Sequence, residues 1–197
     1  MKKIAIFASG SGTNAQNIAE YFLASGDITV SLILANKPDA YVLERAKKLG
    51  IPSMVFTRKE FYESAIILDV LLKNKIDFIV LAGFLWLVPD YLLKTYSGKI
   101  INIHPALLPK YGGKGMYGEK VHQAVIQSGD KQTGITIHFV NDHYDEGEII
   151  FQDSFDILPG DTAESIAQKV HALEYLHFPR VIEETIRRVD SRQQSKA

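Results

Sequence analysis

The chain has 197 residues, of which 46% are hydrophobic and 23% charged, and its formal net charge is −1 at pH 7. This length and composition are typical of a soluble globular domain, and the near-zero charge argues against a nucleic-acid-binding protein with a strongly basic surface. The lack of cysteine excludes disulfides, thiolate metal sites and a cysteine nucleophile, and without a long apolar run we expect a cytoplasmic protein with no membrane contact.

In the first half of the chain, apolar runs alternate with helix-like segments. The runs that predict strands are Ile4–Ala8, Thr29–Ala35, Ser53–Phe56 and Phe78–Ala82. The segments that predict helices are Ala15–Ala24, Ala40–Leu49, Lys59–Lys73 and Asp90–Tyr96. This alternation implies an α/β fold with a doubly wound, mostly parallel, Rossmann-like sheet, in which ligands bind beyond the carboxyl ends of the strands.

A glycine-rich turn, Ser9-Gly-Ser-Gly-Thr-Asn14, joins the first strand to the first helix. Glycines let a ligand approach the backbone, and the N–H groups and dipole of a helix N-terminus favour a phosphate. The turn matches neither a P-loop nor the full dinucleotide pattern, so a monophosphate suits it best. A tight turn without a ligand would use the same glycines.

The first half of the stretch Lys99–Pro109 alternates like a strand, with Asn102 and His104 on one face. An amide that donates to an oxygen, beside an imidazole that moves a proton, is part of an acyl-transfer site. The alternative is that both side chains form the polar face of an edge strand.

The second half of the chain predicts an antiparallel edge to the sheet, with strands over Gly134–Val140 and Glu148–Gln152. The glycine-rich loop Leu107–Gly118 is either a mobile lid or a long surface connection. The remaining expectations are a helix over Glu119–Gln127, a final helix opened by Asp161 and Glu164 and bent near Pro179, a single domain over 1–190 and a frayed polar tail over 191–197.

The acidic turn Asn141–Gly147 offers Asp142 and Asp145 as partners that would hold a protonated imidazole, and spacing does not choose between them. A solvated acidic loop is the alternative. No histidine pair has zinc-binding spacing, so we expect no metal. We expect His138 to be a hydrogen-bonded residue of the sheet, with a place under the site as the alternative. The remaining histidines, His122, His143, His171 and His177, are expected to be surface or capping residues.

Five segments together resemble the phosphoribosylglycinamide formyltransferase family, within the folate-dependent formyltransferase superfamily. They are Ala8-Ser-Gly-Ser-Gly-Thr-Asn14, Leu81-Ala-Gly-Phe84, Ile101-Asn-Ile-His-Pro-Ala-Leu-Leu-Pro-Lys-Tyr111, Gly134-Ile-Thr-Ile-His-Phe-Val140 and Tyr144-Asp-Glu-Gly-Glu-Ile-Ile-Phe-Gln152. The resemblance covers nearly the whole chain in order. It implies direct transfer of a formyl group from 10-formyltetrahydrofolate, a co-substrate, to the primary amine of glycinamide ribonucleotide in purine biosynthesis.

The resemblance also implies roles for individual residues. Asn102 would stabilise the oxyanion, His104 would transfer protons, and Asp145 would raise the pKa of His104. The ribonucleotide would contact Gly12, Thr13, Asn14, His171, Ala172, Leu173 and Glu174. The folate would contact Arg58, Leu85, Trp86, Leu87, Val88, Asn102, Asn141, Asp142, His143, Tyr144 and Asp145. Both partners are small molecules, and the resemblance sets no oligomeric state.

The sequence departs from the family pattern in two ways. Trp86 stands where arginine is common, and the loop Gly112–Gly118 is longer than usual. Another formyl-folate enzyme, either a methionyl-tRNA formyltransferase or a formyltetrahydrofolate hydrolase, is the main alternative. Such enzymes usually carry a further domain for which this chain has no room. A non-catalytic nucleotide-binding module is a second alternative, but it would not need Asn102, His104 and Asp145 together.

Overall fold

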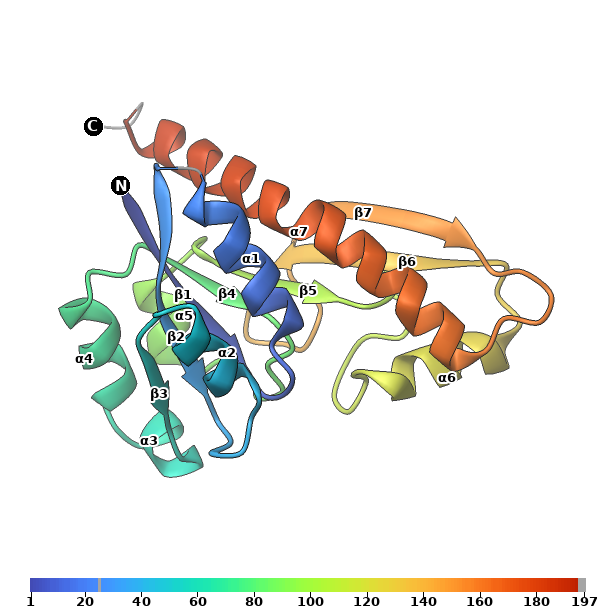
Figure 1. The fold of residues 1–197 in the computed structure, drawn as a ribbon, viewed down its shortest axis with the longest axis horizontal. Helices are drawn as coiled ribbons and strands as arrows, with labels where there is room; N and C mark the ends of the chain where they lie inside the picture. Colours follow the sequence, from blue (N-terminus) through green and yellow to red (C-terminus); the bar gives the residue numbers. More distant parts are fainter. Residues whose placement is uncertain (25, 195–197) are drawn as a thin grey trace.

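The computed structural model of the chain describes residues 1–24 and 26–194. Within them, a seven-stranded sheet has the order β3-β2-β1-β4-β5-β6-β7, with helices on both faces (Figure 1). The strands are β1 (Lys2–Ala8), β2 (Ile28–Ala35), β3 (Ser53–Val55), β4 (Phe78–Leu81), β5 (Ile100–His104), β6 (Gln132–Phe139) and β7 (Ile149–Asp156). The helices are α1 (Thr13–Leu23), α2 (Val42–Lys48), α3 (Arg58–Tyr62), α4 (Ile66–Lys73), α5 (Asp90–Thr95), α6 (Glu119–Ser128) and α7 (Ala163–Gln194).

Strands β1 to β5 pair in parallel, and β6 and β7 pair antiparallel to their neighbours. This confirms the predicted doubly wound, mostly parallel sheet with an antiparallel edge. The register of β5 against β6 sets Asn102 opposite His138 and His104 opposite Thr136. Because side chains alternate between the two faces of a strand, all four side chains share one face of the sheet.

The sheet separates two hydrophobic cores. Alternate residues of β1 supply them: Ile4 and Ile6 pack with residues of α1 and α7, whereas Ala5 and Phe7 pack with residues of α3, α4 and α5. Central strands covered on both faces have continuous apolar sequences rather than alternating ones. The helices that pack in the two cores therefore lie on opposite faces of the sheet. The loops attached to these helices reach the carboxyl ends of the strands from those two faces.

The helix predicted over 59–73 is wrong in extent, because the structure has two helices there. A capping box between Thr57 and Glu60 opens α3. At the junction, the Ser64 hydroxyl donates to the Glu60 carbonyl at 2.8 Å and accepts from the Ile66 N–H at 3.4 Å. Such local side-chain bonds compete with helical ones, so the chain starts α4 afresh.

The last helix also differs from the prediction. Its start is capped by Thr162 and Ser165, whose side chains each accept the other's backbone N–H, rather than by a box between Asp161 and Glu164. Asp161 instead accepts the Leu158 N–H and the Ser165 hydroxyl. Helix α7 continues through Pro179 to Gln194, so the predicted tail begins inside it, and residues 195–197 lie outside the described residues.

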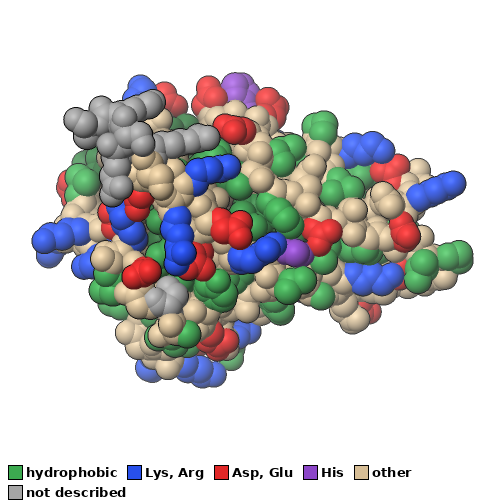
Figure 2. Space-filling model, turned by 90° about the horizontal axis from the view of Figure 1, so that it is seen from above, with side chains coloured by type: hydrophobic (Ala, Val, Ile, Leu, Met, Phe, Trp, Pro, Cys, Tyr) green, Lys and Arg blue, Asp and Glu red, His purple; other side chains and the backbone are tan. Residues whose placement is uncertain are grey.

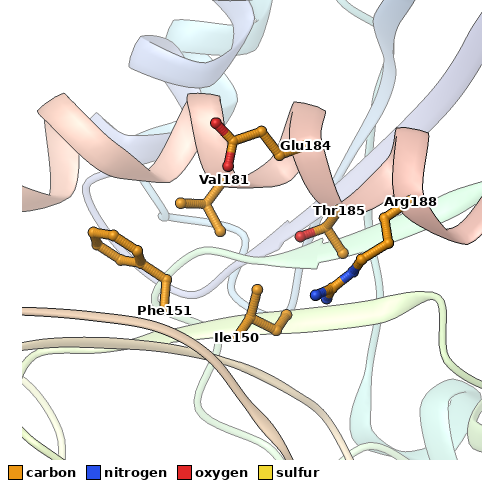
Figure 3. A pocket seen from close by; sticks show the side chains of 6 residues that line it. All are labelled: Ile150, Phe151, Val181, Glu184, Thr185 and Arg188. Atoms are coloured by element: carbon orange, nitrogen blue, oxygen red, sulfur yellow. The ribbon is translucent and has the colours of Figure 1, made fainter.

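No helix in the described part of the chain is long and apolar enough to cross a membrane. Basic and acidic side chains are interspersed on the face seen in Figure 2, in keeping with the small net charge. A small hollow of about 180 Å³ lies between α7 and the edge strand β7 (Figure 3). It shares no lining residue with the much larger cleft described next.

Candidate active site

A cleft of about 1040 Å³ opens at the carboxyl ends of β1, β4 and β5. Its lining includes the glycine-rich turn Ser9–Asn14, the segment Ala82–Trp86 and the strand end Asn102–Pro105. The lining also includes residues 113–119, Tyr144, Asp145 and part of α7. The cleft is at the large end of the range for ligand sites, so it has room for more than one small molecule.

His104 is buried at the floor of this cleft, with 3% of its surface exposed. Its Nε2 lies 2.8 Å from the Tyr111 carbonyl oxygen. Because a carbonyl only accepts, Nε2 carries the proton, and the lone pair of the neutral ring is on Nδ1. Nδ1 faces Asp145 Oδ2 at 3.5 Å. The contacts thus select the tautomer whose basic nitrogen lies beside a carboxylate.

Burial sets the net direction of the His104 pKa. It lowers the pKa of His104 below the ordinary 6.5, and the negative charge of Asp145 offsets this only in part. The expectation that Asp145 raises the His104 pKa therefore holds for the charge pair alone, while the net shift is downward. A neutral imidazole is consequently available as a base at neutral pH.

Asp145 is held from several sides in the turn between β6 and β7. Its backbone is left-handed, with φ 59°, and its Oδ2 accepts the Gly113 N–H at 3.0 Å. Burial raises the pKa of the Asp145 carboxyl, but contact with His138, the charge of His104 and the Gly113 N–H together bring that pKa below its ordinary value. The structure thereby selects Asp145 over Asp142 as the imidazole's partner.

His138 lies under the site, contacting two of its central side chains. Its Nδ1 is 2.8 Å from the Phe139 carbonyl, so this nitrogen carries the proton. Its Nε2 accepts the Asn102 amide at 3.1 Å and lies 3.7 Å from Asp145 Oδ1. The same Asn102 nitrogen is 3.4 Å from Asp145 Oδ1. The expected sheet residue is therefore also the support that orients the Asn102 amide.

The glycine-rich turn meets α7 through Asn14. The Asn14 amide donates to Glu174 Oε2 at 2.9 Å, leaving the Asn14 backbone N–H rather than its side chain for an anion. Glu174 is 5% exposed and also lies 2.9 Å from His171 Nδ1. This hydrogen bond raises the pKa of His171, although burial opposes it. His171 is thus tied to the site and is not a free surface residue.

Arg58 and an aromatic cluster form the opposite wall. The Arg58 guanidinium lies 4.8 Å from the centre of the Tyr62 ring and 5.7 Å from that of Trp86. Trp86 in turn packs against Phe61 and Phe84. Tryptophan therefore provides a flat apolar surface with a cation beside it, which suits a planar ring carrying negative groups.

Most predicted site residues line the cleft, but several do not. Those that line it are Gly12, Thr13, Asn14, Arg58, Leu85, Trp86, Asn102, His104, Tyr144, Asp145, His171 and Glu174. Those that lie outside its lining are Leu87, Val88, Asn141, Asp142, His143, Ala172 and Leu173. Val88 is buried in a core, Leu173 packs against the other, and His143 pairs with Asp142 on the exposed outside of the turn. Neighbouring residues along the chain point in different directions, so only some residues of a sequence motif reach a site.

Several lining residues are not among the contacts predicted for the ribonucleotide or the folate, among them Ser9, Lys37, Tyr117 and His122. Ser9 accepts the Leu85 N–H at 3.1 Å and so ties the glycine-rich turn to the aromatic wall. His122 was assigned to the surface, yet it is buried, because α6 turns it inward beside Val121 and Val125. The apolar residues around His122 were the available signal. No group of His, Asp and Glu suited to a metal occurs among residues 1–24 and 26–194.

Gly12 is the position where the turn depends most on glycine. Its φ is 72°, and a Cβ there would lie 2.8 Å from Val42 Cα. We expect Gly12→Ala to lower the free energy of unfolding by about 1–3 kcal/mol in urea titrations. Gly10→Ala is the matched control, since a Cβ at Gly10 meets nothing within 4 Å. Equal losses in the two variants would contradict this account.

Comparison with known proteins agrees with this geometry. A model of the formyl transferase family matches residues 2–182. The chain is 40% identical to phosphoribosylglycinamide formyltransferase of Bacillus subtilis, covering 94% of this chain and 95% of that one. It is 42% identical to the chloroplastic enzyme of Arabidopsis thaliana, of whose length it spans 64%. The crystal structure of phosphoribosylglycinamide formyltransferase from Bacillus halodurans superposes with a TM-score of 0.83 at 37% identity, covering 93% of this chain and 94% of that one. The chain belongs to the formyl transferase family and, within it, to the phosphoribosylglycinamide formyltransferases.

Proposed function

We propose that the protein transfers a formyl group from 10-formyltetrahydrofolate to the primary amine of glycinamide ribonucleotide. The observation that carries this proposal is the basic Nδ1 of His104, 3.5 Å from Asp145 and on the same strand as Asn102, between two dissimilar walls of one cleft. One wall is a helix N-terminus with free N–H groups, suited to a phosphate. The other is aromatic, suited to a pterin ring.

The two substrates are assigned to opposite walls. The phosphate of the ribonucleotide takes the N–H groups of Gly12, Thr13 and Asn14, and its remaining polar groups extend toward Glu174. The folate packs against Leu85 and Trp86, near Arg58 and Tyr144. This arrangement leaves the amine and the formyl carbon to meet above His104, so that transfer needs no covalent enzyme intermediate.

In the reaction, the amine lone pair attacks the formyl carbon, a carbon–nitrogen bond forms, and the formyl oxygen becomes an oxyanion. The Asn102 amide donates to that oxygen in place of its long 3.4 Å contact with Asp145. His104 Nδ1 takes the proton from the new ammonium, and Asp145 stabilises the imidazolium. The bond from carbon to N10 of the folate then breaks as the proton is returned to N10.

The direct test is a formyl-transfer assay with 10-formyltetrahydrofolate and three acceptors: glycinamide ribonucleotide, initiator methionyl-tRNA and water. We expect transfer to the ribonucleotide alone. Transfer to the tRNA or release of free formate as the main product would assign the chain to the other formyl-folate reactions. No reaction with any acceptor would leave a nucleotide-binding role.

Substitution of Asn14 tests whether the two substrates bind to different walls of the cleft. Because the Asn14 amide bonds Glu174 on the ribonucleotide wall, we expect Asn14→Ala to raise KM for the ribonucleotide by about tenfold with little change in KM for the folate. Asn17→Ala is the control, since Asn17 lies on the same helix but donates to the Tyr175 carbonyl. A parallel rise in both KM values would refute the assignment of this wall.

A further inference from the structure

His122 is a buried polar residue without a partner. It is 4% exposed, and its Nδ1 is buried without a hydrogen bond. Among residues 1–24 and 26–194 no hydrogen bond or ion pair is found for either of its ring nitrogens. Buried polar groups are nearly always hydrogen-bonded, since an unmade bond costs about 1–3 kcal/mol. An imidazole kept in such a position needs a reason beyond packing.

The surroundings of His122 supply that reason. The residue lies on α6 and lines the large cleft. Titratable groups from three elements influence its pKa: His171 and Glu174 of α7, His104 of β5 and Glu119 of its own helix. His122 therefore lines the same cleft as Glu174, on the wall assigned to the ribonucleotide, and as His104, the imidazole that moves the proton.

The ring is neutral at neutral pH. Burial lowers the pKa of His122 below 6.5, and the neighbouring histidines add to this more than Glu174 and Glu119 oppose it. A neutral imidazole has one donor and one acceptor nitrogen. It can therefore bond a hydroxyl, an amide or an amine, the polar groups that a ribosyl glycinamide presents between its phosphate and its reacting nitrogen.

We propose that His122 is a binding residue for the acceptor substrate, hydrogen-bonding the ribosyl glycinamide portion and making no contact with the folate. This inference rests on the proposed function, because it takes the acceptor to be glycinamide ribonucleotide. It makes α6 a third element of the acceptor wall, beside the glycine-rich turn and α7.

A substitution to leucine tests this, because structural and binding roles predict opposite signs. If the imidazole were needed for folding, His122→Leu would lower the melting temperature. If the unpartnered ring serves to bind a ligand, the melting temperature of His122→Leu should be unchanged or higher, because the substitution removes a buried polar group that makes no hydrogen bond. We expect that result together with a rise of about tenfold in KM for the ribonucleotide, an unchanged KM for the folate, and partial recovery of the ribonucleotide KM in His122→Gln or His122→Asn.

Calorimetric titration with glycinamide ribonucleotide alone gives a readout that does not need turnover. We expect Kd to rise about tenfold in His122→Leu and to stay unchanged in Val121→Ala, a control that opens a small gap in the apolar cluster of α6. Equal Kd values for wild type and folded His122→Leu, or an equal rise in both KM values, would overturn the inference. If His122→Leu does not fold, His122→Gln with a wild-type Kd and a lowered melting temperature would also overturn it. Wild-type protein that neither binds nor formylates the ribonucleotide would instead refute the proposed function.

Discussion

Replacing His104 by alanine is expected to lower kcat by about 10²- to 10⁴-fold, the usual contribution of a general acid–base residue. His104 is the ring whose tautomer the structure selects, with Nε2 bonded to the Tyr111 carbonyl and Nδ1 left basic beside Asp145. Without it, the ammonium formed by attack loses the base to which the proposed reaction assigns its proton. Both KM values should change little, because the loss concerns proton transfer rather than substrate binding.

Single-turnover kinetics with both substrates saturating would measure this effect on the chemical step. His143→Ala is the matched control, since His143 is exposed and pairs with Asp142 outside the cleft. Thermal unfolding should show that His104→Ala is folded. A folded variant with near-normal turnover would mean that another group moves the proton.

Replacing Asp145 by asparagine is expected to lower kcat by about 10²-fold or more, because the imidazolium loses its counter-charge. Asparagine tolerates the left-handed backbone of this position, at φ 59°, and its side-chain oxygen can still accept the Gly113 N–H. The substitution therefore removes charge while keeping the turn. That makes the effect electrostatic rather than conformational.

The pH dependence gives this prediction a sign. The acid limb of kcat/KM reflects protonation of His104, and burial already sets that pKa below 6.5. Asp145 is the largest influence that raises the pKa of His104. Its neutralisation lowers that pKa further, so the acid limb of Asp145→Asn should move to lower pH. Asp142→Asn, in the same turn, should leave the limb in place, and an unmoved or upward-shifted limb in Asp145→Asn would contradict the charge pair.

Local patterns predicted the strands well, and many of the residues they singled out at strand ends line the large cleft. Continuous apolar runs such as Phe78–Ala82 identify strands buried on both faces, and polar residues at their carboxyl ends mark where ligands bind. Asn102 and His104 were found because β-strand alternation puts them on one face. The break between α3 and α4 was missed because a single serine, Ser64, provides the bonds that interrupt an otherwise helical pattern.

Local sequence patterns could not predict the contacts between segments that are far apart in the sequence. The choice of Asp145 over Asp142 depends on a left-handed residue and on the Gly113 N–H from another loop. The inward direction of His122 depends on how α6 packs against its neighbours. The net fall in the His104 pKa depends on burial, which a sequence motif does not encode, so the charge pair alone suggested the opposite direction.

The division of the sheet into two cores has an evolutionary consequence. The aromatic wall rests on Phe7, Phe56 and Phe61 in one core, whereas the glycine-rich turn and α7 rest on the other. Ser9 joins the two walls through Gly83 and Leu85, but the side chains packed in one core do not pack in the other, and residues that share no partners tend to have additive effects when substituted. The aromatic wall can therefore accumulate substitutions, such as tryptophan at position 86, while the glycine-rich turn and α7 keep the contacts proposed for the ribonucleotide.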